Sequence, residues 1–141
     1  MGALDIGGLP DGTLVLLDSA PVICFLEGHP KLGPYFAPLF EAHAAGRLRF
    51  AITTITVAEV LTGPLGMGDD VVVRRYRAIF DSWQFVDLDV EIAESAARLR
   101  ASLNLKLADA VQAASALAIN AAALVTYGRD FSRVRSLRVI S

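Results

Sequence analysis

"TLVLLDSAPVICFLEG", residues 13–28, is the stretch that decides the fold. Its first part, 13–18, is a short, continuously apolar run that ends in a carboxylate, which is typical of a strand buried on both faces. Its second part carries Val22, Ile23 and Leu26 at helical spacing, with a proline near the first turn and a glycine at the end. The stretch therefore predicts a buried strand that passes directly into a helix.

The same alternation continues to the end of the chain. Further strand-like runs lie at 48–54, 84–89, 123–127 and 137–141, and helical patterns lie at about 35–45, 56–64, 69–83, 90–103 and 107–122. Strands that are separated by helices pair in parallel. We therefore expect a three-layer α/β/α sandwich with a central parallel sheet of about five strands.

Composition indicates one domain. The chain has 141 residues, of which 54% are hydrophobic and 20% charged, so it can bury a sizeable core. We expect a flexible leader over 1–12, which is rich in glycine and proline, and a single domain over 13–141. The lone Cys24, the absence of a secretory signal pattern and the lack of a bilayer-spanning apolar run lead us to expect a cytoplasmic protein.

The charge balance limits the possible partners. A formal net charge of -2 gives no overall attraction to nucleic acid, so RNA binding would depend on local arginine clusters. Two clusters are visible, one at 74–77 and one at 129–138, although arginines in such positions are also ordinary surface residues.

Four acidic residues stand at the ends of strands or the starts of helices: Asp18, Glu59, Asp109 and Asp130. Each has an ordinary structural interpretation as a cap or turn residue, and Thr56 with Glu59 matches the Thr-x-x-Glu capping box. If the first and fourth strands are neighbours, however, all four open onto one crevice. Carboxylates crowded in this way need a cation, and their oxygens favour Mg²⁺ or Mn²⁺. A phosphodiester hydrolase is the reaction that we expect from such a site.

Four segments carry a family resemblance, in this order and across nearly all of residues 14–140. They are "LLDSAPVICFLEG" (16–28), "ITTITVAEVLTGP" (52–64), "LRASLNLKLADAVQAASALA" (99–118) and "LVTYGRDF" (124–131). Together they resemble the PIN-domain ribonucleases, and most closely the VapC-type toxins of toxin–antitoxin pairs. The resemblance implies a metal-dependent endoribonuclease that uses Mg²⁺ or Mn²⁺.

The resemblance also implies roles for particular residues. Asp18, Glu59 and Asp109 match the family's metal-site acids, and Ser19 and Thr126 match hydroxyl residues that hold the carboxylates or bound water. The chain departs from the family at Gly128, where an acid or amide is usual, and Asp130 is the candidate to replace it.

The implied partners are an RNA substrate, a VapB-type antitoxin whose tail covers the crevice, and a second copy of the chain in a homodimer. Two alternatives remain open. A PIN-like domain without turnover would act only through protein binding, with Gly128 as its support. A receiver-like binding module would need paired acids after the first strand and a lysine near the last strand, and the chain has neither.

Overall fold

The computed structural model describes residues 2–128 and 130–141, and its centre is a five-stranded parallel sheet. The strands follow the order β3-β2-β1-β4-β5. The first and fourth strands are therefore neighbours, which is the condition that we stated for a shared site of the four acids. Their bounds are β1 (Thr13–Leu17), β2 (Leu48–Thr53), β3 (Gln84–Val86), β4 (Ala123–Val125) and β5 (Val139–Ile140).

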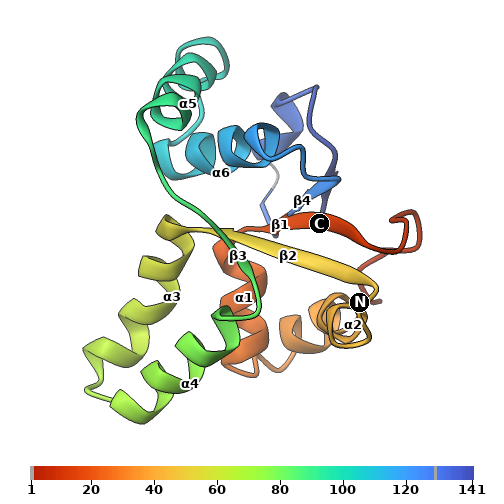
Figure 1. Ribbon diagram of the computed structural model, residues 1–141, viewed down its shortest axis with the longest axis vertical. Helices are drawn as coiled ribbons and strands as arrows, with labels where there is room; N and C mark the ends of the chain where they lie inside the picture. The colour runs from red at the N-terminus through yellow and green to blue at the C-terminus, as the bar shows by residue number, and fades with distance from the viewer. Residues whose placement is uncertain (1, 129) are drawn as a thin grey trace.

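Helices cover both faces of the sheet (Figure 1), and the expected three-layer α/β/α sandwich is confirmed. On one face lie α1 (Ser19–Leu26), α2 (Leu32–Ala44), α3 (Thr54–Gly66) and α4 (Asp70–Phe80), and on the other α5 (Val90–Leu103), α6 (Leu107–Ala118) and the short 3-10 helix η1 (Asp130–Arg133). Within the part of the chain that the structure describes, none of the helices has the length and apolar character needed to cross a bilayer.

The strands are apolar throughout because they are buried on both faces. Val15 and Leu17 point into the core beneath α1 to α4, whereas Leu16 between them points into the core beneath α5 and α6. In the neighbouring strand, Ile52 and Ala51 divide between the same two cores. This alternation is the physical reason for the unbroken apolar runs in the sequence.

The segment that we expected to be a flexible leader contributes to the core. Leu4 and Leu9 are buried in the cluster beneath α1 to α4, and the backbone N–H of Leu4 donates to the carbonyl of Tyr35 at 2.9 Å. The segment is therefore bound to α2 by this hydrogen bond, and its two leucines are part of the core.

The start of α3 differs from our expectation. The N-cap is Thr53, which lies in extended backbone and accepts a hydrogen bond from the N–H of Thr56 at 3.2 Å. Because β2 runs directly into α3, Thr56 lies inside the first turn, and Glu59 falls beyond it. The predicted capping box of Thr56 with Glu59 was therefore wrong, as was the predicted helix end, since α3 continues through Pro64 to Gly66.

Candidate functional site

Polar side chains gather where three adjacent strands end. Asp18 follows β1, Thr53 is the last residue of β2, and Thr126 follows β4. The three strands are parallel neighbours, so these residues emerge at the same edge of the sheet. Open α/β sheets place their ligand sites at this edge.

The carboxylate of Asp18 is held by three donors. Its Oδ1 accepts from the backbone N–H of Ser19 at 2.9 Å, which caps α1, and from the side-chain amide of Gln112 at 3.2 Å. Its Oδ2 accepts from the hydroxyl of Thr126 at 2.8 Å. Because the three donors come from three different parts of the chain, they fix the orientation of the Asp18 carboxylate.

Gln112 joins the helix α6 to this edge of the sheet. Besides its bond to Asp18, its Nε2 donates to the hydroxyl of Thr56 at 2.8 Å, and its Oε1 accepts from the hydroxyl of Thr53 at 3.0 Å. The side chain is 1% exposed, so all of these bonds are made away from bulk solvent. We did not predict a role for Gln112; its signal is an amide side chain in the middle of an alanine-rich, buried helix.

Glu59 is connected to the same residues through Ser19. The hydroxyl of Ser19 donates to Oε1 of Glu59 at 2.7 Å and lies 3.2 Å from the hydroxyl of Thr56. Ser19 is buried, whereas Glu59 is exposed. We call the connected set the polar network; its members are Asp18, Ser19, Thr53, Thr56, Glu59, Gln112 and Thr126.

The turn after β4 completes this edge of the network. Thr126 is fully buried, and its Oγ1 accepts from the backbone N–H of Gly128 at 3.0 Å while its hydrogen goes to Asp18. A Cβ added at Gly128 would meet Thr126 Oγ1 at 3.7 Å, an ordinary contact. The glycine is therefore not required by crowding at this position.

The other two predicted acids are Asp109, at the start of α6, and Asp130, at the start of η1. Asp109 is half-buried in the first turn of α6, three residues before Gln112, and residues at this spacing share a helix face. Since Gln112 contacts Asp18, this face of α6 is turned toward the polar network. Asp130 begins η1, but its side chain lies outside the described part of the structure, so its place in the site stays a prediction.

The network offers the donor atoms that a hard cation prefers. Carboxylate and hydroxyl oxygens suit Mg²⁺ or Mn²⁺, and Mg²⁺ is commonly held by one or two carboxylates with waters filling the other positions. Among the described residues, no group of three or more His, Cys, Asp and Glu is placed to hold a metal ion by protein ligands alone. The described carboxylates and hydroxyls therefore supply oxygen donors of the kind that such an ion takes, but they do not by themselves form a closed metal site.

The two histidines have structural roles instead. Nδ1 of His29 accepts from the N–H groups of Lys31 and Leu32 at the start of α2. The ring of His43 stacks on Phe50 with centroids 4.4 Å apart, and burial lowers the pKa of this imidazole. Neither side chain has a hydrogen bond to the network among those described.

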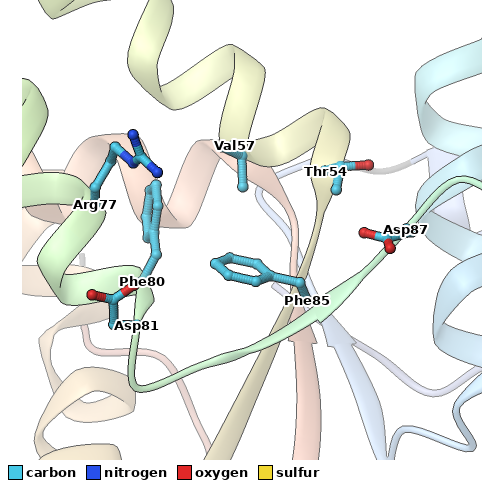
Figure 2. Close-up of a pocket in the computed structure, with 7 residues that line it drawn as sticks. All are labelled: Thr54, Val57, Arg77, Phe80, Asp81, Phe85 and Asp87. Carbon is cyan, nitrogen blue, oxygen red and sulfur yellow. The ribbon is translucent and has the colours of Figure 1, made fainter.

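A concave feature, the β3 groove, lies beside the edge strand between α3 and α4 (Figure 2). Its centre is apolar, with the ring of Phe85 pointing toward Val57 and Phe80, and Phe85 is 47% exposed. Its remaining lining residues are polar or charged: Thr54, Arg77, Asp81 and Asp87. Thr54 and Asp87 follow β2 and β3, so the groove reaches the same sheet edge as the polar network.

Comparisons with known proteins agree on one kind of domain. A model of the PIN domain matches residues 15–137. The VapBC2 structure from Rickettsia felis, bound to a DNA fragment of its promoter, is similar with a TM-score of 0.72 and 21% identity, covering 89% of this chain and 96% of that chain. A toxin–antitoxin complex from Klebsiella pneumoniae has a TM-score of 0.71 and 25% identity over 90% and 96% of the two chains.

VapBC-1 from nontypeable Haemophilus influenzae has a TM-score of 0.70 and 19% identity, over 89% of this chain and 96% of that chain. No curated protein matches the sequence.

Proposed function

This chain belongs to the PIN domain family, and on that premise we propose that it is a metal-dependent endoribonuclease acting as the toxin of a toxin–antitoxin pair. The observation that carries the proposal is the polar network, in which buried donors hold Asp18 and Glu59 at the end of the sheet where ligands bind. A carboxylate that only caps a helix accepts a hydrogen bond from the backbone of that helix. The carboxylate of Asp18 accepts from α1 and, in addition, from α6 and from the turn after β4.

We propose that Asp18, Asp109 and Asp130 hold Mg²⁺ or Mn²⁺ and that Glu59 supports the site. When bound, the ion supplies a water of lowered pKa for attack on phosphorus and offsets the charge that develops on the phosphate. The chain's own contribution is to orient its carboxylates: Thr126 and Gln112 hold Asp18, and Ser19 holds Glu59. Because the acids are oriented before the substrate binds, the free energy of orienting them does not add to the activation barrier.

The polar network also supports a role for Glu59 that differs from capping. Its carboxylate accepts from Ser19 on α1, not from the backbone of α3, so it is free of the helix start. Glu59 is exposed, which places it where water or a substrate phosphate has access. We propose that it acts on the site through bound water.

We further propose an antitoxin partner of the VapB type, because solved structures similar to this chain are VapBC complexes. The β3 groove reaches the sheet edge that carries the network, so a bound antitoxin segment could extend from the groove to the carboxylates. A homodimer and a cytoplasmic location complete the proposal, both from the family resemblance.

The first experiment is cleavage of a mixed pool of single-stranded and structured RNA by the purified chain. We expect cleavage with Mn²⁺, and loss of cleavage with EDTA or in Asp109→Asn prepared identically. Cleavage that persists in both controls would contradict the metal-dependent mechanism. A chain that binds Mn²⁺ and an antitoxin but cuts no RNA would favour the alternative, a PIN-like domain that acts through protein binding.

A second experiment tests Asp130 with a matched control. Asp130→Asn is expected to reduce cleavage much more than Asp87→Asn, which makes the same chemical change in the β3 groove. Equal activities of the two variants would remove Asp130 from the site.

A further inference from the structure

Gln112 contacts one carboxylate of the polar network, Asp18, and two of its threonines. Its amide bonds to Asp18 at the β1–α1 junction and to Thr53 and Thr56 at the β2–α3 junction. From these contacts we propose that Gln112 is a positioning residue, which sets the orientation of Asp18 toward a bound cation. The inference rests on the proposed function and extends it to a residue outside the acids.

The direction of the amide follows from its neighbours. An ionised carboxylate accepts only, so the Nε2 end of Gln112 must face Asp18 Oδ1. The opposite end, Oε1, then accepts the hydroxyl hydrogen of Thr53. A flipped amide would bring two acceptor oxygens together at 3.2 Å, so only one orientation satisfies both neighbours.

Two hydroxyl groups continue the hydrogen bonds from Gln112 toward Glu59. Thr56 accepts the second Nε2 hydrogen of Gln112, and the hydrogen of Ser19 goes to Glu59. The 3.2 Å contact between the two hydroxyls is then made by the hydrogen of Thr56. Donors thus run from Gln112 to Asp18 on one side and, through Thr56 and Ser19, to Glu59 on the other.

The two oxygens of the Asp18 carboxylate receive different numbers of described hydrogen bonds. Oδ1 receives two donors, from Ser19 and Gln112, whereas Oδ2 receives one described donor, from Thr126. Counting donors from the described residues alone, Oδ1 has its acceptor capacity filled, whereas Oδ2 keeps a lone pair that a cation can use. Removing the Gln112 amide would release this constraint and let the carboxylate turn.

The first test is Mn²⁺ binding measured by calorimetry on the full chain, without substrate. Gln112→Met, which keeps the length but removes the amide, is expected to weaken Mn²⁺ binding by about 10- to 100-fold, as losses of outer partners of metal ligands do. The matched control is Ser115→Ala, a buried polar residue on the same helix whose Oγ has no hydrogen-bond partner among the described residues. It should bind Mn²⁺ as wild type does.

A second measurement uses the wild type and so does not depend on how the variant folds. The chain has two glutamines, Gln112 in the network and Gln84, which is exposed on β3. In a spectrum of ¹⁵N-labelled glutamine side chains, Mg²⁺ should shift the NH₂ signals of Gln112 and leave those of Gln84 in place.

The outcomes separate this inference from the proposed function. A folded Gln112→Met that binds Mn²⁺ with wild-type affinity, or Gln112 signals that do not move with Mg²⁺, would overturn the positioning role while leaving the nuclease proposal standing. A wild-type chain that binds no Mn²⁺ would overturn both.

Discussion

Replacing Thr126 by valine removes one hydroxyl from the site and very little else. Thr126 is fully buried, and its hydroxyl donates to Asp18 Oδ2 at 2.8 Å. Valine has nearly the same shape, so the change leaves no large cavity. The carboxylate, however, faces a methyl group in place of a donor.

The size of the effect follows from these contacts. A hydrogen bond to a charged group contributes about 1.5–3 kcal/mol. The N–H of Gly128 also loses its acceptor, but Gly128 is exposed, so water replaces that bond at little cost. We therefore expect Thr126→Val to lower the free energy of unfolding by about 2 kcal/mol. For a chain of this size that corresponds to a fall in melting temperature of about 6–8 °C.

The assay is denaturant unfolding at neutral pH in EDTA, so that metal binding does not contribute. Thr62→Val is the matched control, because Thr62 is exposed and its hydroxyl donates to the carbonyl of Ala58 in its own helix. Its effect should stay within about 0.5 kcal/mol. In an Asp18→Asn background the acceptor is neutral, and Thr126→Val should cost only about 1 kcal/mol. Equal costs in both backgrounds, or no cost in either, would refute the assigned bond.

Three further predictions use other parts of the molecule. Mg²⁺ or Mn²⁺ should raise the melting temperature of the wild type, by the equivalent of about 2.7 kcal/mol at 100 times the dissociation constant, and Asp109→Asn should reduce the gain; equal melting curves with and without metal in both proteins would count against the site. Gly128→Asp should fold, because its Cβ has room, and should gain more from Mn²⁺ than the wild type in the same melting assay; an unchanged gain would show that this turn does not reach the ion. Burial lowers the pKa of His43 below its ordinary 6.5, so the unfolded chain binds the proton more readily, and stability should fall as the pH drops through 6.5 toward the folded pKa. His43→Phe should make the denaturant midpoint less dependent on pH in that window, and an unchanged dependence would assign the effect elsewhere.

Local sequence patterns were sufficient to predict most of the helices and strands. The helix expected over 90–103 is α5 with those bounds, because its apolar stripe and its cap at Asp89 are both local features. The strands β1 and β4 are neighbours, which is the condition on which the predicted shared site of Asp18 and Asp130 depends. The α6 helix ends at Ala118, before the end of its alanine-rich pattern at 122, because Asn120 takes the left-handed conformation with φ 51° and the N–H of Ala121 bonds to the carbonyl of Ala116.

The sequence by itself therefore determined the layered parallel fold and which acids stand at the ends of its strands. The family resemblance implied that Ser19 and Thr126 hold carboxylates, but only the tertiary structure decided which acid each of them contacts and added Gln112. Ser19 and Glu59 are 40 residues apart, and Gln112 and Thr126 lie 94 and 108 residues from Asp18. Periodicity reports the face on which a residue lies, because it depends on neighbours within a few positions. The partner of a buried amide depends on how strands and helices from distant parts of the chain pack, and no local pattern contains that information.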